Sequence, residues 1–389
     1  MKIFIYHPSL FLGGASVLFY RIFCFGKNLT NLYFIDCDGG FAHSRSPHES
    51  RILMCDDHER LKNEISDDDV VICVSSSIRK IKSEFELLDL NPRVLIWVVH
   101  PYEASIRYFK NARKITTTLG CVCGKFFINL FYSKYKRTRN FISRYEGDSI
   151  FFMDSAAIRS TNYFLDLNIN EEKNVLPIPY YESETFDLYK PRVKIVNTSK
   201  LKIAYFGRVE EFKFPPVAAL LTSIASSEIF SRVSIAIIGD GKGLDAHKKR
   251  FEGKLDIEFL GWVENESAKR FMTENIDLVF AMGTAALDSS TLGIPTILLN
   301  PSNKESEQKF KWLYTTHGKN LGEYTDSPWF VDDGLSLEQV ISDCLEKYDF
   351  HAEKSREYVE NNHGMNVVFN QLMTSCQHAN LRIKNIIKV

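Results

Sequence analysis

Short apolar runs alternate with amphipathic stretches along the whole chain. Polar residues or glycines bound each run, and the stretch between two runs is long enough to form a helix. This alternation is typical of β-α-β units, which build parallel sheets covered by helices. The apolar runs predict strands at Lys2–Tyr6, Asn31–Ile35, Val70–Val74, Val94–Val99, Ser149–Met153, Lys202–Phe206, Val233–Ile238, Ile257–Phe259, Leu278–Ala281 and Thr296–Leu299.

The same pattern occurs in two successive halves of the chain. The chain has 389 residues, whereas one hydrophobic core rarely serves more than roughly 250–300 residues. Two prolines, Pro177 and Pro179, precede a polar stretch without hydrophobic periodicity, which indicates a linker. We therefore expect an α/β protein with two similar-sized domains and a cleft between them, over residues 1–178 and 201–365, with the linker over 179–200. Ligands of such sheets bind at the carboxyl ends of the strands.

Charge is balanced over the chain but unevenly distributed. There are 48 Lys and Arg against 49 Asp and Glu, a net charge of −1, which excludes a globally basic nucleic-acid binder. Residues 104–145, the basic aromatic segment, contain ten Lys or Arg, nine Phe or Tyr and no acidic residue. This composition suits an anionic membrane surface or an acidic lipid-linked acceptor. The alternative is an ordinary solvated face over core helices.

No apolar run reaches the roughly 18–20 residues that span a bilayer, and the N-terminal residues are typical of a buried strand rather than of a signal peptide. We expect a cytoplasmic protein, peripheral on the cytoplasmic face of the membrane if the basic aromatic segment docks there. Among eight cysteines, the close pair Cys121 and Cys123 lacks the second pair that a zinc site needs. We therefore expect reduced thiols and no bound metal.

Cations and glycines follow the predicted strands of the second half. Arg208 comes directly after a strand and a glycine, and Lys213 follows five residues later. Together they could clamp a diphosphate, Arg as a planar fork and Lys as a point charge. After the next strand, Gly239 opens a glycine-rich turn that lets the backbone approach phosphates. This turn is no Walker loop, because Leu244 stands where Ser or Thr would be needed.

A short helix is predicted after the strand Leu278–Ala281. Gly283 allows a turn, Thr284 can cap the helix, and Gly293 ends it. The amides at a helix N-terminus form a natural anion site. Asp288 lies one turn into the helix, where its carboxylate could accept hydrogen bonds from sugar hydroxyls.

In this order and spacing, the motifs resemble the C-terminal domain of GT-B glycosyltransferases, most closely retaining glycosyltransferase family 4. The resemblance covers about residues 200–300 well and the whole chain loosely. It implies two Rossmann-like domains whose parallel sheets face a central cleft, with a C-terminal helix over 366–389 that packs back toward the first domain.

The resemblance also implies roles for single residues of the second domain. Arg208 and Lys213 would bind the donor diphosphate, and the backbone of Val263 would meet the nucleobase. The loop through Gly283, Thr284 and Ala285 would hold phosphate. Asp288 would hold the ribose.

In the first domain, the resemblance implies that Gly13 and Gly14 face the donor and that His100 faces the transferred sugar and the acceptor. His100, Arg208 and Lys213 are therefore the predicted catalytic residues. Of the neighbouring groups, we expect His7 to be structural and Glu103 to be a solvated carboxylate.

The chain departs from the family pattern at one of two glutamates that usually stand eight positions apart. Asp288 replaces the second of them with the same charge, but Phe280 stands in place of the first and cannot substitute for it. The contact that usually recognises the donor sugar is therefore missing or supplied differently. Several bacterial surface-polysaccharide transferases look similar to the Gly-Thr-x-Ala-Leu-Asp form that stands here at residues 283–288, so the loss does not imply inactivity.

The predicted function is that of a retaining, metal-independent, hexosyl-type glycosyltransferase in cell-surface polysaccharide or lipopolysaccharide synthesis. It would move a sugar from a nucleotide-diphosphate donor, with a UDP-sugar as the leading candidate, to a glycan or lipid-diphosphate acceptor, without a cofactor and without nucleic acid. A catalytically silent GT-B subunit that binds a nucleotide sugar or acts as a scaffold is one alternative. A nucleotide-sugar 2-epimerase is the other.

Overall fold

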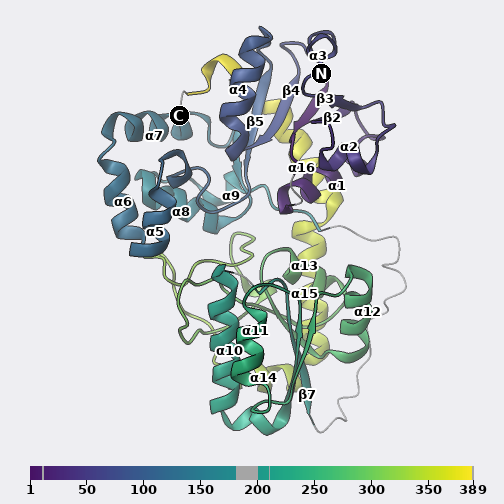
Figure 1. The fold of residues 1–389 in the computed structure, drawn as a ribbon, viewed down its shortest axis with the longest axis vertical. Coiled ribbons are helices and arrows are strands. Elements are labelled where there is room, and N and C mark those ends of the chain that lie inside the picture. Colours follow the sequence, from purple (N-terminus) through teal and green to yellow (C-terminus); the bar gives the residue numbers. More distant parts are fainter. Residues whose placement is uncertain (11–12, 181–199, 210, 388–389) are drawn as a thin grey trace. The chain divides into compact units, whose positions relative to one another are not determined.

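The computed structural model describes residues 1–10, 13–180, 200–209 and 211–387. The chain forms two compact units, the first from Met1–Tyr181 and Met365–Val389 and the second from Glu182–Gly364. The linker expected at 179–200 lies almost entirely outside the described residues. Each unit is a sheet of mostly parallel strands covered by helices (Figure 1).

The sheet of the first unit has the strand order β3-β2-β1-β4-β5, and both β6 and β13 pair with β5. Strands β1 to β6 are parallel, whereas β13 runs antiparallel to β5. The strands are β1 Ile3–Tyr6, β2 Leu32–Asp36, β3 Ile52–Met54, β4 Val70–Val74, β5 Arg93–Val98, β6 Ile150–Phe152 and β13 Leu381–Arg382.

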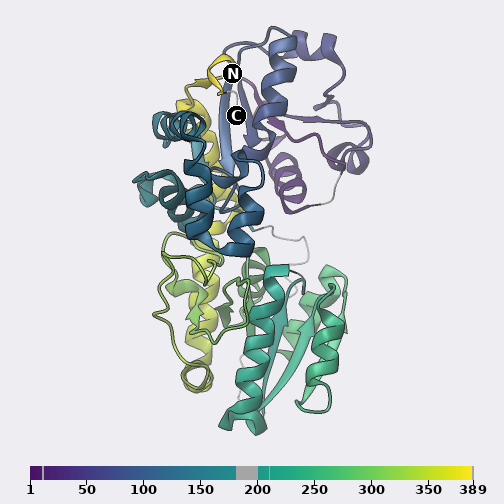
Figure 2. The same ribbon diagram turned by 60° about the vertical axis from the view of Figure 1, so that its left-hand side comes forward.

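Helices α1 and α16 contribute to the hydrophobic core of the first unit. Phe19 and Phe23 of α1 and Val368 and Leu372 of α16 are buried in one cluster with strand residues such as Trp97. Figures 1 and 2 show α16, in yellow, beside the strands of this unit. The helices of the unit are α1 Gly14–Gly26, α2 Phe41–Arg45, α3 His58–Glu64, α4 Ile78–Leu87, α5 Ala112–Leu119, α6 Cys121–Asn129, α7 Tyr132–Tyr145, α8 Ser155–Leu165, α9 Glu171–Asn174 and α16 Met365–His378.

The second unit has the strand order β12-β11-β10-β7-β8-β9. Its strands are β7 Leu201–Phe206, β8 Val233–Ile238, β9 Ile257–Gly261, β10 Leu278–Ala281, β11 Thr296–Leu298 and β12 Lys311–Trp312. Strand β12 is antiparallel to β11. The predicted α/β architecture with parallel sheets is confirmed, and each sheet also gains a two-residue antiparallel strand too short to leave a pattern in the sequence.

The helices of the second unit surround a core centred on the strands β7, β8 and β10. Val217 and Leu221 of the first helix are fully buried, as is Phe280 of β10. The helices are α10 Phe214–Ser226, α11 Leu244–Phe251, α12 Asn265–Asn275, α13 Thr284–Thr291, α14 Leu337–Glu346 and α15 Tyr348–His363. No helix within the described ranges is both long and apolar enough to cross a membrane.

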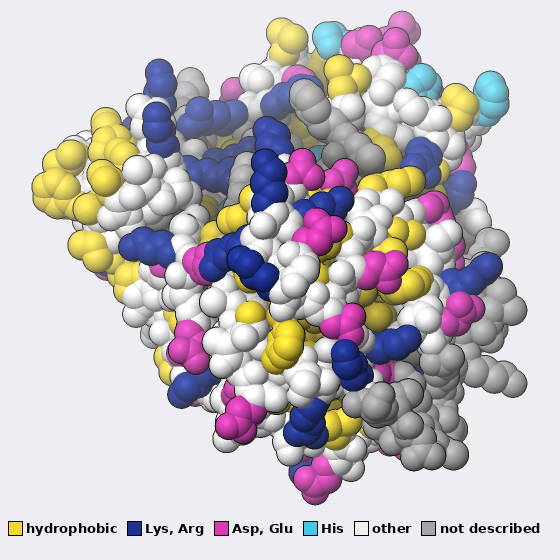
Figure 3. Space-filling model, turned by 60° about the horizontal axis from the view of Figure 1, so that its bottom comes forward, with side chains coloured by type: hydrophobic (Ala, Val, Ile, Leu, Met, Phe, Trp, Pro, Cys, Tyr) yellow, Lys and Arg dark blue, Asp and Glu magenta, His cyan; other side chains and the backbone are white. Residues whose placement is uncertain are grey.

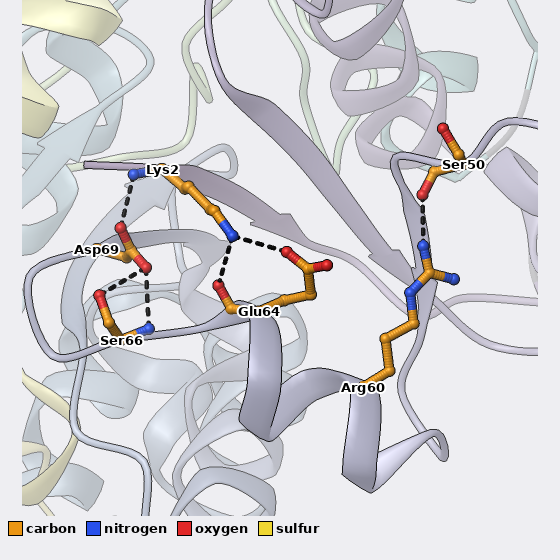
Figure 4. Close-up of polar contacts among 6 residues, drawn as sticks. All are labelled: Lys2, Ser50, Arg60, Glu64, Ser66 and Asp69. Carbon is orange, nitrogen blue, oxygen red and sulfur yellow. Dashed lines mark hydrogen bonds and ion pairs between the residues drawn. The ribbon is translucent and has the colours of Figure 1, made fainter.

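An aspartate secures the amino ends of neighbouring central strands in each sheet. Asp69, just before β4, accepts hydrogen bonds from the Lys2 amide at 2.6 Å and from the Ser66 amide and hydroxyl at 2.9 Å (Figure 4). In the second unit, Asp277, just before β10, accepts from the Lys202 amide at 2.8 Å. Asp69 is buried and has a structural role. Both aspartates lie at the edge opposite to the carboxyl ends of the strands.

Candidate functional site

Four neighbouring strands of the second sheet end at glycines with positive φ. Gly283, Gly207, Gly239 and Gly261 lie at the carboxyl ends of β10, β7, β8 and β9, with φ values of 65°, 144°, 141° and 64°. Since these strands are parallel and adjacent, the four glycines form one row along the edge. The backbone is therefore bare of side chains at these four positions, on the edge where ligands of such sheets bind.

The middle two glycines are packed against each other. A Cβ atom on Gly239 would lie 2.0 Å from the carbonyl oxygen of Gly207, so no larger residue fits there. The Gly207 amide donates to the Ile238 carbonyl at 3.0 Å, and the Gly239 amide donates to the Gly261 carbonyl at 2.8 Å. These contacts hold the glycine-rich turn directly against the backbone that carries Arg208.

Arg208 is exposed on a backbone that is held from two sides. The Tyr205 hydroxyl donates to the Arg208 carbonyl at 2.8 Å, and the Val209 amide donates to the Asp240 carbonyl at 2.9 Å. The half-buried Lys213 ends a short 3-10 turn just before α10. The next residue, Phe214, packs against Gly243 of the glycine-rich turn. Both predicted cations are thus attached to segments that contact this turn.

Helix α13 begins beside Gly207. The Ala285 Cβ is 4.0 Å from the position that a Cβ on Gly207 would take. The prediction that Thr284 caps the helix is wrong: Gly283 is the N-cap because its φ of 65° suits glycine, and Thr284 is the exposed first helical residue. No side chain caps the helix, and no atom lies within 4 Å of a Cβ placed on Gly283. The first amides of α13 are therefore approachable by an anion.

The remaining predicted residues of the second unit extend the same edge. Asp288 is half-buried one turn into α13. Val263 is half-buried two residues beyond the end of β9. Trp262, directly after Gly261, is 76% exposed. The residues predicted from the sequence do not include it. A strand-end glycine followed by Trp was the available signal, since an exposed indole can stack on a nucleobase.

Phe280 lies fully inside the second unit. Its ring packs edge-on against Phe310, with 5.3 Å between the ring centroids. The position where the family usually has its first glutamate therefore supplies core packing here.

The first unit has its own open helix N-terminus at the carboxyl end of β1. Gly13 is the N-cap of α1 and Gly14 its first residue; both are exposed, and no atom lies within 4 Å of a Cβ placed on either. His7, at the end of β1, lies with Nε2 3.1 Å from the Ser16 hydroxyl of α1. Burial lowers the pKa of His7, with a smaller opposing effect of Asp36. This neutral histidine joins the strand to the helix.

His100 follows β5 and is half-buried. Burial, together with the charges of Arg113 and Arg107, lowers the pKa of His100 to about 4. The imidazole is therefore neutral near pH 7. Its Nδ1 accepts the Tyr102 amide at 3.2 Å, which places the ring proton on Nε2. His100 is thus prepared to donate one hydrogen bond from Nε2.

The expectation that Glu103 is a solvated carboxylate is wrong. Its amide donates to the His100 carbonyl at 3.1 Å, and this turn folds the side chain inward, where only 6% of the residue is exposed. Burial raises the pKa of Glu103, although the Arg107 guanidinium donates to Oε1 at 2.7 Å. The pair anchors the turn that follows His100.

All eight cysteines lie in the described part of the chain and are free thiols. Across the same residues, no three His, Cys, Asp or Glu side chains are grouped so that they could hold a metal ion.

Comparisons with known proteins find similarity in structure alone. No protein-family model matches the chain, and no curated protein matches it in sequence. The structure of Anabaena HepE in complex with UDP matches with a TM-score of 0.60 and 13% identity, over 97% of this chain and all of that one. The lipopolysaccharide outer core galactosyltransferase WaaB matches with a TM-score of 0.59 and 13% identity, over 96% of this chain and 99% of that one.

A glycosyltransferase from Rickettsia africae matches with a TM-score of 0.59 and 12% identity, over 97% of this chain and 98% of that one. At such low identity the matches establish architecture and not activity. The chain has the GT-B fold, which it shares with glycosyltransferases.

Proposed function

We propose that the protein is a glycosyltransferase that uses a nucleotide-diphosphate sugar, most closely related to retaining family 4. The observation that carries the proposal is the carboxyl edge of the second sheet. There, four strand-end glycines, the uncapped N-terminus of α13 and Arg208 form a surface suited to a diphosphate. The UDP in the HepE complex supports a UDP-sugar as the donor.

The chemical task is to stabilise the nucleoside diphosphate as it leaves. In the proposed reaction the bond from the anomeric carbon to the diphosphate oxygen breaks, and a bond from that carbon to the acceptor oxygen forms on the same face. The acceptor proton passes to the departing phosphate, and the configuration is retained. Arg208, Lys213 and the amides of Thr284 and Ala285 would stabilise the negative charge that develops on the diphosphate.

The other predicted residues would position the donor. Asp288 would accept hydrogen bonds from the ribose, and the backbone of Val263 with the exposed Trp262 indole would hold the base. In the first unit, neutral His100 would donate from Nε2 to a sugar hydroxyl, and the open α1 N-terminus at Gly13 and Gly14 would accept an anionic group. No step in this proposal uses a metal ion or a cofactor.

The proposed acceptor is a glycan or a lipid-linked glycan of a cell-surface polysaccharide. The likeness to WaaB, a lipopolysaccharide galactosyltransferase, supports that pathway and a hexosyl donor. The competing function is a silent subunit that binds a nucleotide sugar without transferring it. Phe280 favours this alternative, because a buried phenylalanine stands where the family usually has a glutamate, and the donor site therefore has one carboxylate fewer.

A thermal-shift screen tests donor binding directly. UDP, GDP, ADP, CMP and dTDP are each added with and without magnesium; a ligand at 100 times its Kd should stabilise the fold by about 2.7 kcal/mol. A shift with one diphosphate and no need for magnesium supports the donor site and identifies the base. If none of the nucleotides shifts the melting temperature, the donor site as proposed does not exist.

A matched pair of variants separates the donor clamp from general charge effects. Lys213→Ala should remove the nucleotide shift and lower transfer at least about hundredfold, a loss of about 2.7 kcal/mol in transition-state stabilisation. Lys249→Ala, an exposed lysine on α11, is the control and should change neither. Unchanged turnover in Lys213→Ala would contradict the assignment. Nucleotide binding without transfer to any acceptor would favour the silent subunit.

A further inference from the structure

Helix α6 of the first unit carries an apolar stripe on its solvent side. Leu119, Val122, Phe126 and Leu130 are 65%, 68%, 68% and 64% exposed. Val122, Phe126 and Leu130 are spaced four residues apart, which places them along one side of α6 and its C-terminal end, and Leu119 is the last residue of α5, just before α6 begins. Phe131 and Tyr132 continue the exposed surface into the start of α7. These six residues form what we call the apolar ridge.

The apolar ridge stands on a well-packed base. Gly124 of α6 packs so closely against Thr116 of α5 that a Cβ there would lie 2.0 Å from the Thr116 hydroxyl. Asp166, at the end of α8, accepts from Lys125 of α6 at 2.5 Å and from Tyr135 of α7 at 2.7 Å. The inner sides of α6 and α7 are thus held to the unit, and exposure of the ridge is a property of the fold.

All charged side chains on the helices that carry the apolar ridge are basic. Residues 112–145, which make up α5, α6 and α7, contain no Asp or Glu. Figure 3 shows hydrophobic side chains projecting at the left of the view, with Lys and Arg beside them. The exposed cations of these helices are Arg113, Lys114, Lys136, Arg137, Arg139 and Arg144.

We propose that the apolar ridge and the cations of α5 and α7 form a docking surface for an anionic lipid bilayer. The ridge would enter the boundary between headgroups and acyl chains, and the cations would meet lipid phosphates. An exposed apolar stripe that is flanked only by basic side chains is complementary to an anionic bilayer in both polarity and charge. The inference sharpens the sequence-based membrane hypothesis, because Tyr108, Phe109 and Phe141 of the basic aromatic segment are buried and cannot take part.

Vesicle co-sedimentation of the full chain tests the proposal without any sugar donor. Vesicles of phosphatidylcholine with phosphatidylglycerol are compared with vesicles of phosphatidylcholine alone. Binding should require phosphatidylglycerol and should fall steeply with salt, since charges are screened over about 10 Å at 0.1 M. Lys136→Gln combined with Arg137→Gln should lower binding roughly 25-fold, from about fivefold for each cation near an anionic surface.

Variants of the ridge test the apolar part. Phe126→Glu combined with Leu130→Glu should lower vesicle binding at least about tenfold. Because both side chains are exposed, the melting temperature and its shift with nucleotide should stay as in the wild type. The matched control is Leu87→Glu, which changes a 74% exposed leucine at the end of α4 and should bind as the wild type does.

The results also separate this proposal from its competitors. Failure of the wild type to bind anionic vesicles, or full binding by the ridge variant, would overturn it. If light scattering shows that the wild type self-associates, that the ridge variant does not, and that neither binds vesicles, the ridge covers a second copy and the proposal is wrong. Vesicle binding does not depend on nucleotide binding, so the proposed transferase function can fail while this inference stands.

Discussion

Substituting Gly239 with alanine should damage both the stability of the second unit and its nucleotide binding. The new Cβ would lie 2.0 Å from the Gly207 carbonyl oxygen, far inside the roughly 3.5 Å of normal contact. The backbone of Gly207 and Arg208 would have to move by more than 1 Å. That movement would break the 3.0 Å bond from the Gly207 amide to Ile238.

The magnitude follows from two terms. A non-glycine residue at the φ of 141° costs on the order of 1–3 kcal/mol. Leaving the Gly207 amide without its partner costs about 1–3 kcal/mol more. The sum is about 4 kcal/mol, which corresponds to a loss on the order of 10 °C in melting temperature for a unit of this size.

The control substitution is Gly253→Ala, which isolates the conformational term. Gly253 has a φ of 75°, and no atom lies within 4 Å of a Cβ placed there, so about 1–2 kcal/mol is expected. Differential scanning calorimetry with and without UDP compares the two variants. Gly239→Ala should melt well below Gly253→Ala and lose its shift with nucleotide. Equal melting temperatures and equal nucleotide shifts in the two variants would refute the reasoning.

Three further predictions concern single side chains. Burial, with a smaller effect of Arg250, lowers the pKa of His247 to about 4, so the stability that the neutral histidine contributes is complete above about pH 6.5 and is lost as the pH falls through 4. When the pH is lowered from 7.5 to 4.5, the melting temperature of His247→Leu should therefore fall less than that of the wild type. Equal falls in the two proteins would contradict this prediction. Asp69→Asn should destabilise the first unit by about 2–3 kcal/mol in urea titrations, because the amide NH₂ of the new side chain would face a backbone N–H that now donates to the Asp69 carboxylate. An unchanged urea midpoint would show that the contact is dispensable. His100→Ala should lower kcat/KM of transfer about 100-fold, whereas His100→Gln, which keeps a donor, should lower it less than about tenfold; equal losses in steady-state assays would argue against a donating role.

The strands that pattern analysis located best are the buried parallel ones. Val70–Val74, Val233–Ile238 and Leu278–Ala281 match the structure at both ends. A strand buried on both faces is a continuous apolar run, so its ends are visible in the sequence. Strands β3, β12 and β13 were missed because they have two or three residues and depend on a partner strand for their conformation.

The site residues also divide into those that the sequence located and those that it did not. Motif order and spacing brought Arg208, Gly239 and Gly283 together in the prediction, because each follows a strand and parallel strands end at one edge. Trp262 was missed although it directly follows a strand-end glycine, because its exposure depends on the packing of distant elements. The predicted roles of the individual residues in donor and acceptor binding stay predictions.

Local sequence thus contained the strands, the glycine turns and the positions of the cations, because these depend on side-chain polarity and backbone freedom over a few residues. Burial of a given side chain depends on elements distant in the sequence. Glu103 became a buried ion-paired carboxylate through a turn back to His100, and Phe109 became buried while Phe126 was left exposed within one basic aromatic segment. Packing between distant elements decides which members of a pattern reach solvent, and no local pattern records it.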